Sequence, residues 1–179
     1  MTFDPRGVLN TYLRAQRHHV LGILNGLDEE AMHAAVLPSG WTPVGLVRHL
    51  TLDVGRFWFG EIVLGESRAM DAPKLCDAWH VARDVPAADV LDLYRQQIER
   101  SDVIIATTSL ATPPVGDAET LLGWQPRDLY DVLMHVIVET ACHAGHLDAV
   151  VEVLSGRQWI VNTEPTQLVE PGRGRRERP

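Results

Sequence analysis

Apolar side chains recur at helical spacing in four long segments, and this pattern predicts four amphipathic helices. The segments run from Pro5 to about Gly26, from Pro43 to Gly65, from Pro86 to about Thr107, and from about Pro126 to Ser155. Each is bounded by proline or glycine, the residues that most often mark helix starts and stops. No β-hairpin or βαβ pattern competes. We therefore predict an all-α fold, an up-down four-helix bundle with long connections.

The stretches on either side of the third predicted helix lack clear periodicity. We expect residues 66–85 to form a long crossover and residues 107–125 to form a second irregular connection. After Gly156 the chain is rich in glycine, proline and arginine, a composition typical of disorder. The predicted organisation is one bundle over residues 1–156 and an irregular tail over residues 157–179.

Composition narrows the class of protein. A chain of 179 residues, 45% of them hydrophobic, suits one domain with a real core. No apolar stretch approaches the roughly 20 residues of a membrane span, and the first residues do not resemble a signal peptide. Cys76 and Cys142 form no disulfide framework, so we expect a cytoplasmic location. The net charge of -8 argues against nucleic acid as a partner, and a homodimer is compatible with such a bundle.

Two polar residues interrupt the apolar side of the last predicted helix. Glu139 and His143 fall within a stripe formed by Leu129, Val132, Val136, Leu147, Val150 and Leu154. Burying a carboxylate and an imidazole costs several kcal/mol unless they are paired or bound to a metal. Because they are four residues apart, they lie about 6 Å from each other along one side of the helix. They can therefore bind one metal ion together.

The second predicted helix offers a third ligand. His49 and Asp53 border its apolar stripe, so His49 is the expected cross-bundle ligand and Asp53 the residue that orients a histidine. His146 is near enough to His143 to be a further ligand or to support catalysis. His135 lies eleven residues, or about 16 Å, from His146, so one ion cannot bind both. A His/Glu/His set leaves coordination positions open, as catalytic metal sites do.

Other interpretations of these residues stay open. Glu139 and His143 could hydrogen-bond each other, or they could pair with Arg48 or Arg56. We expect Cys142, on the flank of the same helix, to pack as a small buried thiol. Trp79 and Trp124 lie in the two long connections, where they could line the mouth of a pocket.

Two sequence motifs resemble the DinB-like superfamily. Residues 39–42 (SGWT), 46–50 (LVRHL) and 58–60 (WFG) are similar to its second-helix signature, and residues 139–148 (ETACHAGHLD) to its last-helix signature. The resemblance covers most of residues 1–156. It implies a metal held by one side chain of the second helix and two of the last, here His49, Glu139 and His143. Many members have a histidine at the position of Glu139. With a carboxylate at this position, the sequence is similar to the mycothiol-dependent maleylpyruvate isomerase branch.

The resemblance also implies a chemistry. Members include metal-dependent transferases and isomerases that use mycothiol or bacillithiol. We accordingly predict a thiol-dependent transferase in which Zn²⁺, with Ni²⁺ or Fe²⁺ as alternatives, activates a low-molecular-weight thiol for attack on an electrophile. Two alternatives remain: a metal-dependent hydrolase with the same ligands, and a non-catalytic metal-binding protein of the stress response.

Overall fold

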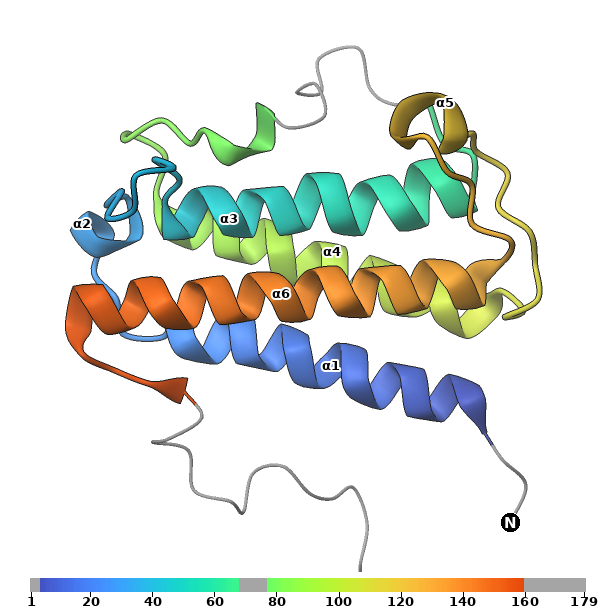
Figure 1. Ribbon diagram of the computed structural model, residues 1–179, viewed down its shortest axis with the longest axis horizontal. Helices are drawn as coiled ribbons and strands as arrows, with labels where there is room; N and C mark the ends of the chain where they lie inside the picture. The colour runs from blue at the N-terminus through green and yellow to red at the C-terminus, as the bar shows by residue number, and fades with distance from the viewer. Residues whose placement is uncertain (1–3, 68–76, 160–179) are drawn as a thin grey trace, which may run out of the picture.

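The computed structural model describes residues 4–67 and 77–159, and all regular elements in these ranges are helical. Four main helices pack against one another (Figure 1): α1 (Pro5–Leu24), α3 (Pro43–His49) continued by η1 (Leu50–Val63), α4 (Ala87–Thr107) and α6 (Leu129–Ser155). Shorter elements lie in the connections: α2 (Glu29–Met32), η2 (Asp77–Trp79) and α5 (Glu119–Leu122). The predicted all-α bundle is confirmed, and α5 is a short helix within a connection that we expected to be irregular.

Side-chain caps explain where three of the long helices begin. Asp4, Thr42 and Asp128 each accept a hydrogen bond from the backbone N–H three residues ahead, at 3.0–3.1 Å. α6 therefore begins directly after Asp128 rather than at Pro126. It ends at Gly156, whose positive φ of 72° forms the predicted glycine cap.

The long helices run in two opposite directions, two helices in each. α1 and α6 point one way, whereas α3–η1 and α4 point the other way (Figure 1). The Gly116 N–H donates to the carbonyl oxygen of Ile62 at 2.8 Å, so the end of η1 lies beside the connection that follows α4. At the opposite end, the Ala87 N–H donates to Glu29 at 2.8 Å. The end of η1 and the start of α4 therefore lie at opposite ends of the bundle, as predicted for helices joined by a long crossover.

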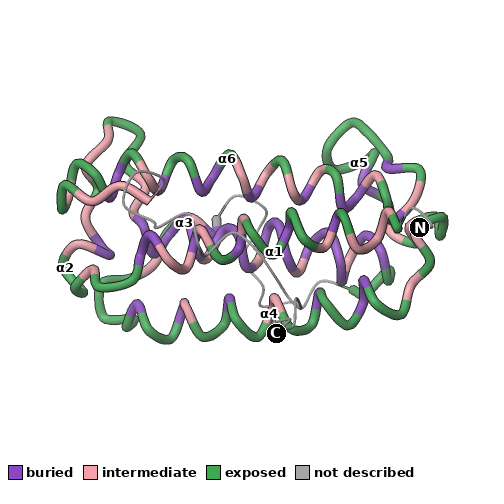
Figure 2. The backbone as a smooth tube through the Cα atoms, turned by 90° about the horizontal axis from the view of Figure 1, so that it is seen from below, coloured by how far each residue is buried: buried purple, intermediate pink, exposed green. Residues whose placement is uncertain are grey.

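Buried positions recur along the inward sides of the long helices (Figure 2). The largest fully buried side chains include Leu13, Phe57, Phe59, Leu133 and Leu147. Burying each of these contributes roughly 1.5–3 kcal/mol to folding. Leu64 is 43% exposed, because η1 ends one residue earlier, at Val63.

The described part of the predicted tail lies against α1. Arg157 donates hydrogen bonds to the carbonyl oxygens of Asn25 and Ile23, and the Trp159 ring stacks on His19 at 5.2 Å. The remainder of the tail and Cys76 lie outside the described residues. Within residues 4–67 and 77–159, no helix is both long enough and apolar enough to cross a membrane.

Candidate metal centre

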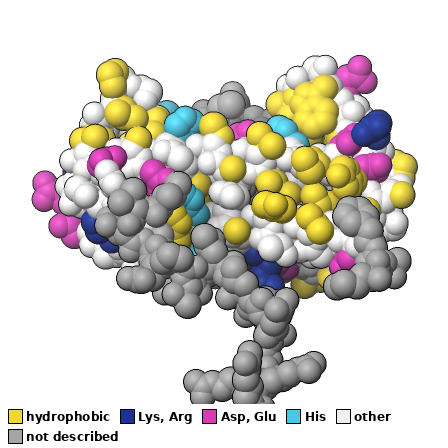
Figure 3. Space-filling model, turned by 60° about the horizontal axis from the view of Figure 1, so that its bottom comes forward, with side chains coloured by type: hydrophobic (Ala, Val, Ile, Leu, Met, Phe, Trp, Pro, Cys, Tyr) yellow, Lys and Arg dark blue, Asp and Glu magenta, His cyan; other side chains and the backbone are white. Residues whose placement is uncertain are grey.

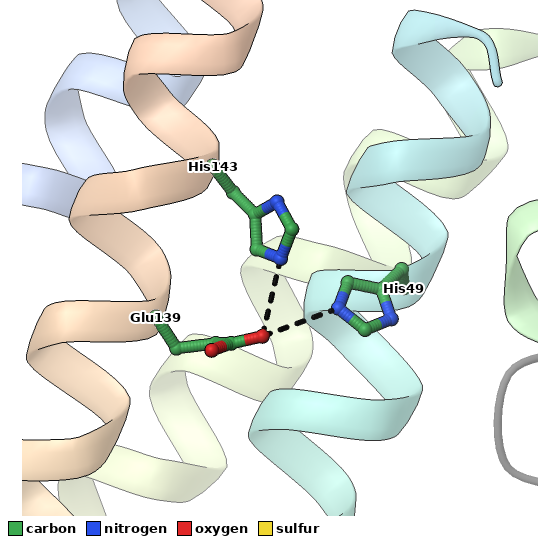
Figure 4. Close-up of side chains that lie close together, drawn as sticks. All are labelled: His49, Glu139 and His143. Atoms are coloured by element: carbon green, nitrogen blue, oxygen red, sulfur yellow. Dashed lines mark hydrogen bonds and ion pairs between the residues drawn. The ribbon is translucent and has the colours of Figure 1, made fainter. Parts of the chain in front are cut away.

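Three polar side chains from two helices meet between α3 and α6 (Figure 4). His49 is the last residue of α3, and Glu139 and His143 lie on successive turns of α6. Nε2 of His143 is 3.2 Å from Oε1 of Glu139, and Nε2 of His49 is 3.7 Å from the same oxygen. One ligand atom from each residue lies within 4.8 Å of the other two. The residues predicted to meet across the bundle therefore do so.

The periodicity of α6 accounts for half of this arrangement. His143 is buried and Glu139 is half-buried, while Val136 and Leu147 on the same stripe are fully buried. The four-residue spacing turns both polar groups toward α3, where apolar side chains would otherwise pack. Their mutual hydrogen bond, one of the interpretations left open by the sequence, is present. It satisfies only part of the capacity of the two groups.

Asp53 determines which nitrogen of His49 faces the centre. Oδ2 of Asp53 lies 3.0 Å from Nδ1 of His49. Because an ionised carboxylate can only accept, Nδ1 donates its proton to Asp53 and Nε2 carries the lone pair. Nε2 is buried and has no hydrogen-bond partner among the described residues. A buried lone pair that faces a carboxylate and a second histidine is well suited to bind a metal ion.

The protonation of these groups is coupled. The hydrogen bond with the His143 imidazole, followed by the close contact with the His49 imidazole, holds the pKa of Glu139 well below its ordinary value, despite partial burial. Burial alone would lower the pKa of His49, but its contacts with Asp53 and Glu139 outweigh this and raise the pKa above its ordinary value. The centre therefore combines an anionic carboxylate with an imidazole, that of His49, for whose Nε2 a proton and a metal ion compete.

The donor set fits a divalent transition metal. Two imidazoles and one carboxylate are ligand types that Zn²⁺ uses in proteins, and neutral imidazole also suits Ni²⁺ and Fe²⁺. Three protein ligands leave at least one coordination position for another molecule. The buried His-Glu-His group could thus bind a metal ion and keep it accessible to a small ligand.

Trp79 covers one side of the centre. Its ring stacks on the His49 imidazole at 4.2 Å with an interplanar angle of 18°, and it lies 5.5 Å from the His143 ring. Arg48 helps to hold this connection, because its Nη1 donates to the carbonyl oxygen of His80 at 2.7 Å. The connection before α4 therefore contributes a wall to the site.

His146 and Cys142 lie outside the group of ligand atoms. Nδ1 of His146 is 3.4 Å from Nδ1 of His143, the nitrogen that points away from Glu139, and His146 is exposed. Its role in catalysis stays a prediction. Cys142 is exposed, so the prediction of a buried thiol is wrong. It lies on the side of α6 that also exposes Val138, and no helix of residues 4–67 and 77–159 covers this side.

The winding of η1 brings a further aromatic residue to this side of the bundle. η1 has i→i+5 hydrogen bonds, as in a π-helix. His49 and Trp58 are nine residues apart, which is two and a half α-helical turns and would place them on opposite sides. In the wider winding, nine residues make about two turns. Trp58 consequently faces α6, with its ring 4.5 Å from His135.

The α-helical pattern gave no sign that Trp58 neighbours the site. The nearest signal was the run WFG in the second-helix motif, which marks similarity but not direction. His135 is outside the His-Glu-His group, and its ring packs against Trp58 and Trp124.

A comparison with protein families shows which family the chain resembles. A family model described as Mycothiol-S-transferase matches residues 8–156, which span the bundle from the first turn of α1 to the glycine that ends α6. No curated protein and no solved structure matches the chain. The matched range includes every residue of the candidate centre.

Proposed function

The chain belongs to the mycothiol-S-transferase family, and on that basis we propose that it is a metal-dependent enzyme that joins a mycothiol-type thiol to an electrophile. In this proposal His49, Glu139 and His143 hold the metal, with Zn²⁺ as the expected ion and Ni²⁺ or Fe²⁺ as alternatives. The observation that carries the proposal is the buried Nε2 of His49. It lacks a hydrogen-bond partner among the described residues and faces the other two donors.

The surrounding side chains support a catalytic role for this centre. A divalent metal bound there would keep a coordinated thiol deprotonated at neutral pH. Asp53 holds the His49 ring in the tautomer that presents Nε2 to the centre. Trp79 excludes water from the stacked face of His49. His146, exposed and in contact with Nδ1 of His143, can hold a proton where the site meets solvent.

A comparison of products with and without thiol tests the proposal. Purified protein is loaded with Zn²⁺, supplied with mycothiol and iodoacetamide, and assayed for thiol consumption and for the thioether product. The metal-loaded protein should consume thiol faster than the metal-free protein. His143→Ala should lose this acceleration, whereas His18→Ala, on the exposed side of α1, should keep it.

The same experiment separates the alternatives. Hydrolysis of an ester or amide by the loaded protein, with no effect of thiol, would favour a metal-dependent hydrolase with the same ligands. Metal binding without turnover of either kind would favour a non-catalytic metal-binding protein. Equal rates for the wild type and His143→Ala would refute the proposed site.

A further inference from the structure

A second cluster of side chains lies one helical turn from the candidate metal centre. His135 precedes Glu139 by four residues on α6, a rise of about 6 Å. Its ring lies 4.5 Å from Trp58 and 5.2 Å from Trp124, and the two tryptophans are 5.4 Å apart. In the space-filling view, histidine and acidic side chains lie along the hollow between two raised ends of the molecule (Figure 3). The cluster is thus close enough to share one bound molecule with the centre.

His135 has unused hydrogen-bonding capacity in this cluster. It is half-buried, and neither ring nitrogen has a hydrogen bond or ion pair within residues 4–67 and 77–159. Burial lowers its pKa, although the charge of Glu139 acts in the opposite direction. A neutral imidazole keeps one N–H donor and one acceptor nitrogen. A half-buried donor without a partner among the described residues is suited to a polar group of a ligand.

Trp124 is exposed and yet held in place. It is 37% exposed, whereas Trp58 beneath it is buried. The side chain of the next residue, Gln125, accepts the Ala118 N–H at 2.8 Å and donates to the carbonyl oxygen of Gly116 at 3.0 Å. The same connection is bonded to the end of η1 through the Gly116 N–H. Trp124 therefore offers a fixed aromatic surface, which favours stacking at low entropic cost.

We infer that Trp58, Trp124 and His135 form the subsite for the electrophile, and that this substrate is planar and conjugated with an oxygen acceptor. The inference rests on the proposed function. Trp124 stacks on the planar group, and His135 donates a hydrogen bond to the oxygen on which negative charge develops. Trp58 supports both rings from below.

A chloronitroaromatic compound illustrates the reaction. The thiolate sulfur forms a bond to the carbon that carries chlorine, and the electron pair of the ring moves onto a nitro oxygen. Chloride then leaves with the electron pair of its bond, and the ring regains aromaticity. No proton is transferred in this step, so His135 acts as a hydrogen-bond donor to the substrate throughout.

Binding of an unreactive planar compound tests the subsite without relying on turnover. The dissociation constant of 2,4-dinitroaniline is measured by calorimetry in metal-loaded and metal-free protein. Trp124→Ala and His135→Phe should each weaken binding by about 3- to 10-fold. His135→Gln retains an N–H donor, so its dissociation constant for 2,4-dinitroaniline should stay closer to that of the wild type. Trp159→Ala and His18→Phe, on the α1 side of the bundle, are the matched controls.

Transfer rates give the second measurement. The ratio of kcat/KM for 1-chloro-2,4-dinitrobenzene to kcat/KM for iodoacetamide is measured in each protein. Trp124→Ala and His135→Phe should each lower this ratio by about 3- to 10-fold, at unchanged metal content. If these variants still transfer thiol, bind 2,4-dinitroaniline as tightly as the wild type and keep its ratio of kcat/KM for the two electrophiles, the inference is overturned. The proposed function would then still stand. Absence of any thiol transfer would refute the proposed function. Selective loss of dinitroaniline binding would then still support a planar-ligand subsite.

Discussion

Replacing Asp53 by Asn tests whether this carboxylate sets the affinity of the centre for its metal. Asn preserves the size of the side chain but removes the charge that accepts the Nδ1 proton of His49. The side chains of Asp53 and His49 are only 5% and 11% exposed, so water screens their contact weakly. Because the volume is unchanged, the variant leaves no cavity in the core. Its main effect should therefore fall on the orientation and basicity of His49.

The expected size of this effect follows from the contact itself. A hydrogen bond to a charged group contributes about 1.5–3 kcal/mol, which corresponds to roughly 10- to 100-fold in an equilibrium constant. Loss of the partner of a metal-binding histidine typically has a similar effect. Asp53 also raises the pKa of His49, so its removal reduces competition from protons. The dissociation constant for Zn²⁺ should accordingly rise about 10- to 100-fold, most clearly near pH 8.

Competition with a chromophoric chelator measures this change directly. Asp148→Asn is the matched control. Oδ1 of Asp148 lies 2.7 Å from Nε2 of His19, and this carboxylate–histidine pair is not part of the metal centre. Thermal unfolding of both metal-free variants separates a loss of stability from a loss of affinity. Unchanged affinity in Asp53→Asn, or an equal loss in both variants, would refute the assigned role of Asp53.

Three further predictions address the ligands, the pH dependence and the packing. His49→Ala or His143→Ala should abolish tight binding of about one metal ion per chain, as read by elemental analysis, whereas His135→Ala should retain it; equal loss in all three would contradict the ligand set. Because the folded pKa of His49 is raised, its protonation stabilises the metal-free protein below about pH 6.5, and this stabilisation is lost as the pH rises through the raised value. A metal ion and this proton compete for His49, so the stabilisation by added Zn²⁺ should instead increase as the pH rises through the raised pKa. Thermal unfolding measures both stabilisations. If both fall, or both rise, with pH, His49 is not the group for which the proton and the metal compete. Gly145→Ala should stabilise the protein by up to about 1 kcal/mol, because the added Cβ meets nothing within 4 Å and alanine favours a helix. Gly116→Ala should instead destabilise it by about 1–3 kcal/mol, because its Cβ would meet a backbone carbonyl oxygen of η1. Denaturant unfolding measures both glycine variants, and the same sign for the two would contradict the packing argument.

The long helices and half of the candidate centre could be predicted from the amino-acid pattern. Asp4 and Thr42 mark helix starts because a side-chain oxygen caps an N–H only three residues away. Glu139 and His143 share one side of α6 because four residues make about one turn. The hydrophobic stripe around them showed that this side faces the core. These relations act within a single element, so they are readable along the chain.

Residues of different elements were harder to place. His49 could be assigned to the centre because facing helices of a bundle contribute inward side chains, and the family motif pointed to the same position. Trp79 and Trp124 were expected at a pocket mouth. Only the packed connections, however, show that Trp79 lies over His49 and Trp124 beside His135. The exposure of Cys142 likewise depends on which side of α6 its neighbours leave uncovered.

The winding of η1 is the clearest case that only the tertiary structure decided. A shift from i→i+4 to i→i+5 backbone bonding changes no local pattern of apolar and polar residues, yet it turns Trp58 to the side of His49. Because π-helical bonding is rare, a helical pattern predicts ordinary α-helical bonding, and tertiary contacts can override such a local preference. Local periodicity and capping therefore determined the helices and the Glu139–His143 pair. The contacts between helices and connections determined the cluster that surrounds them, because those contacts join residues far apart in the chain.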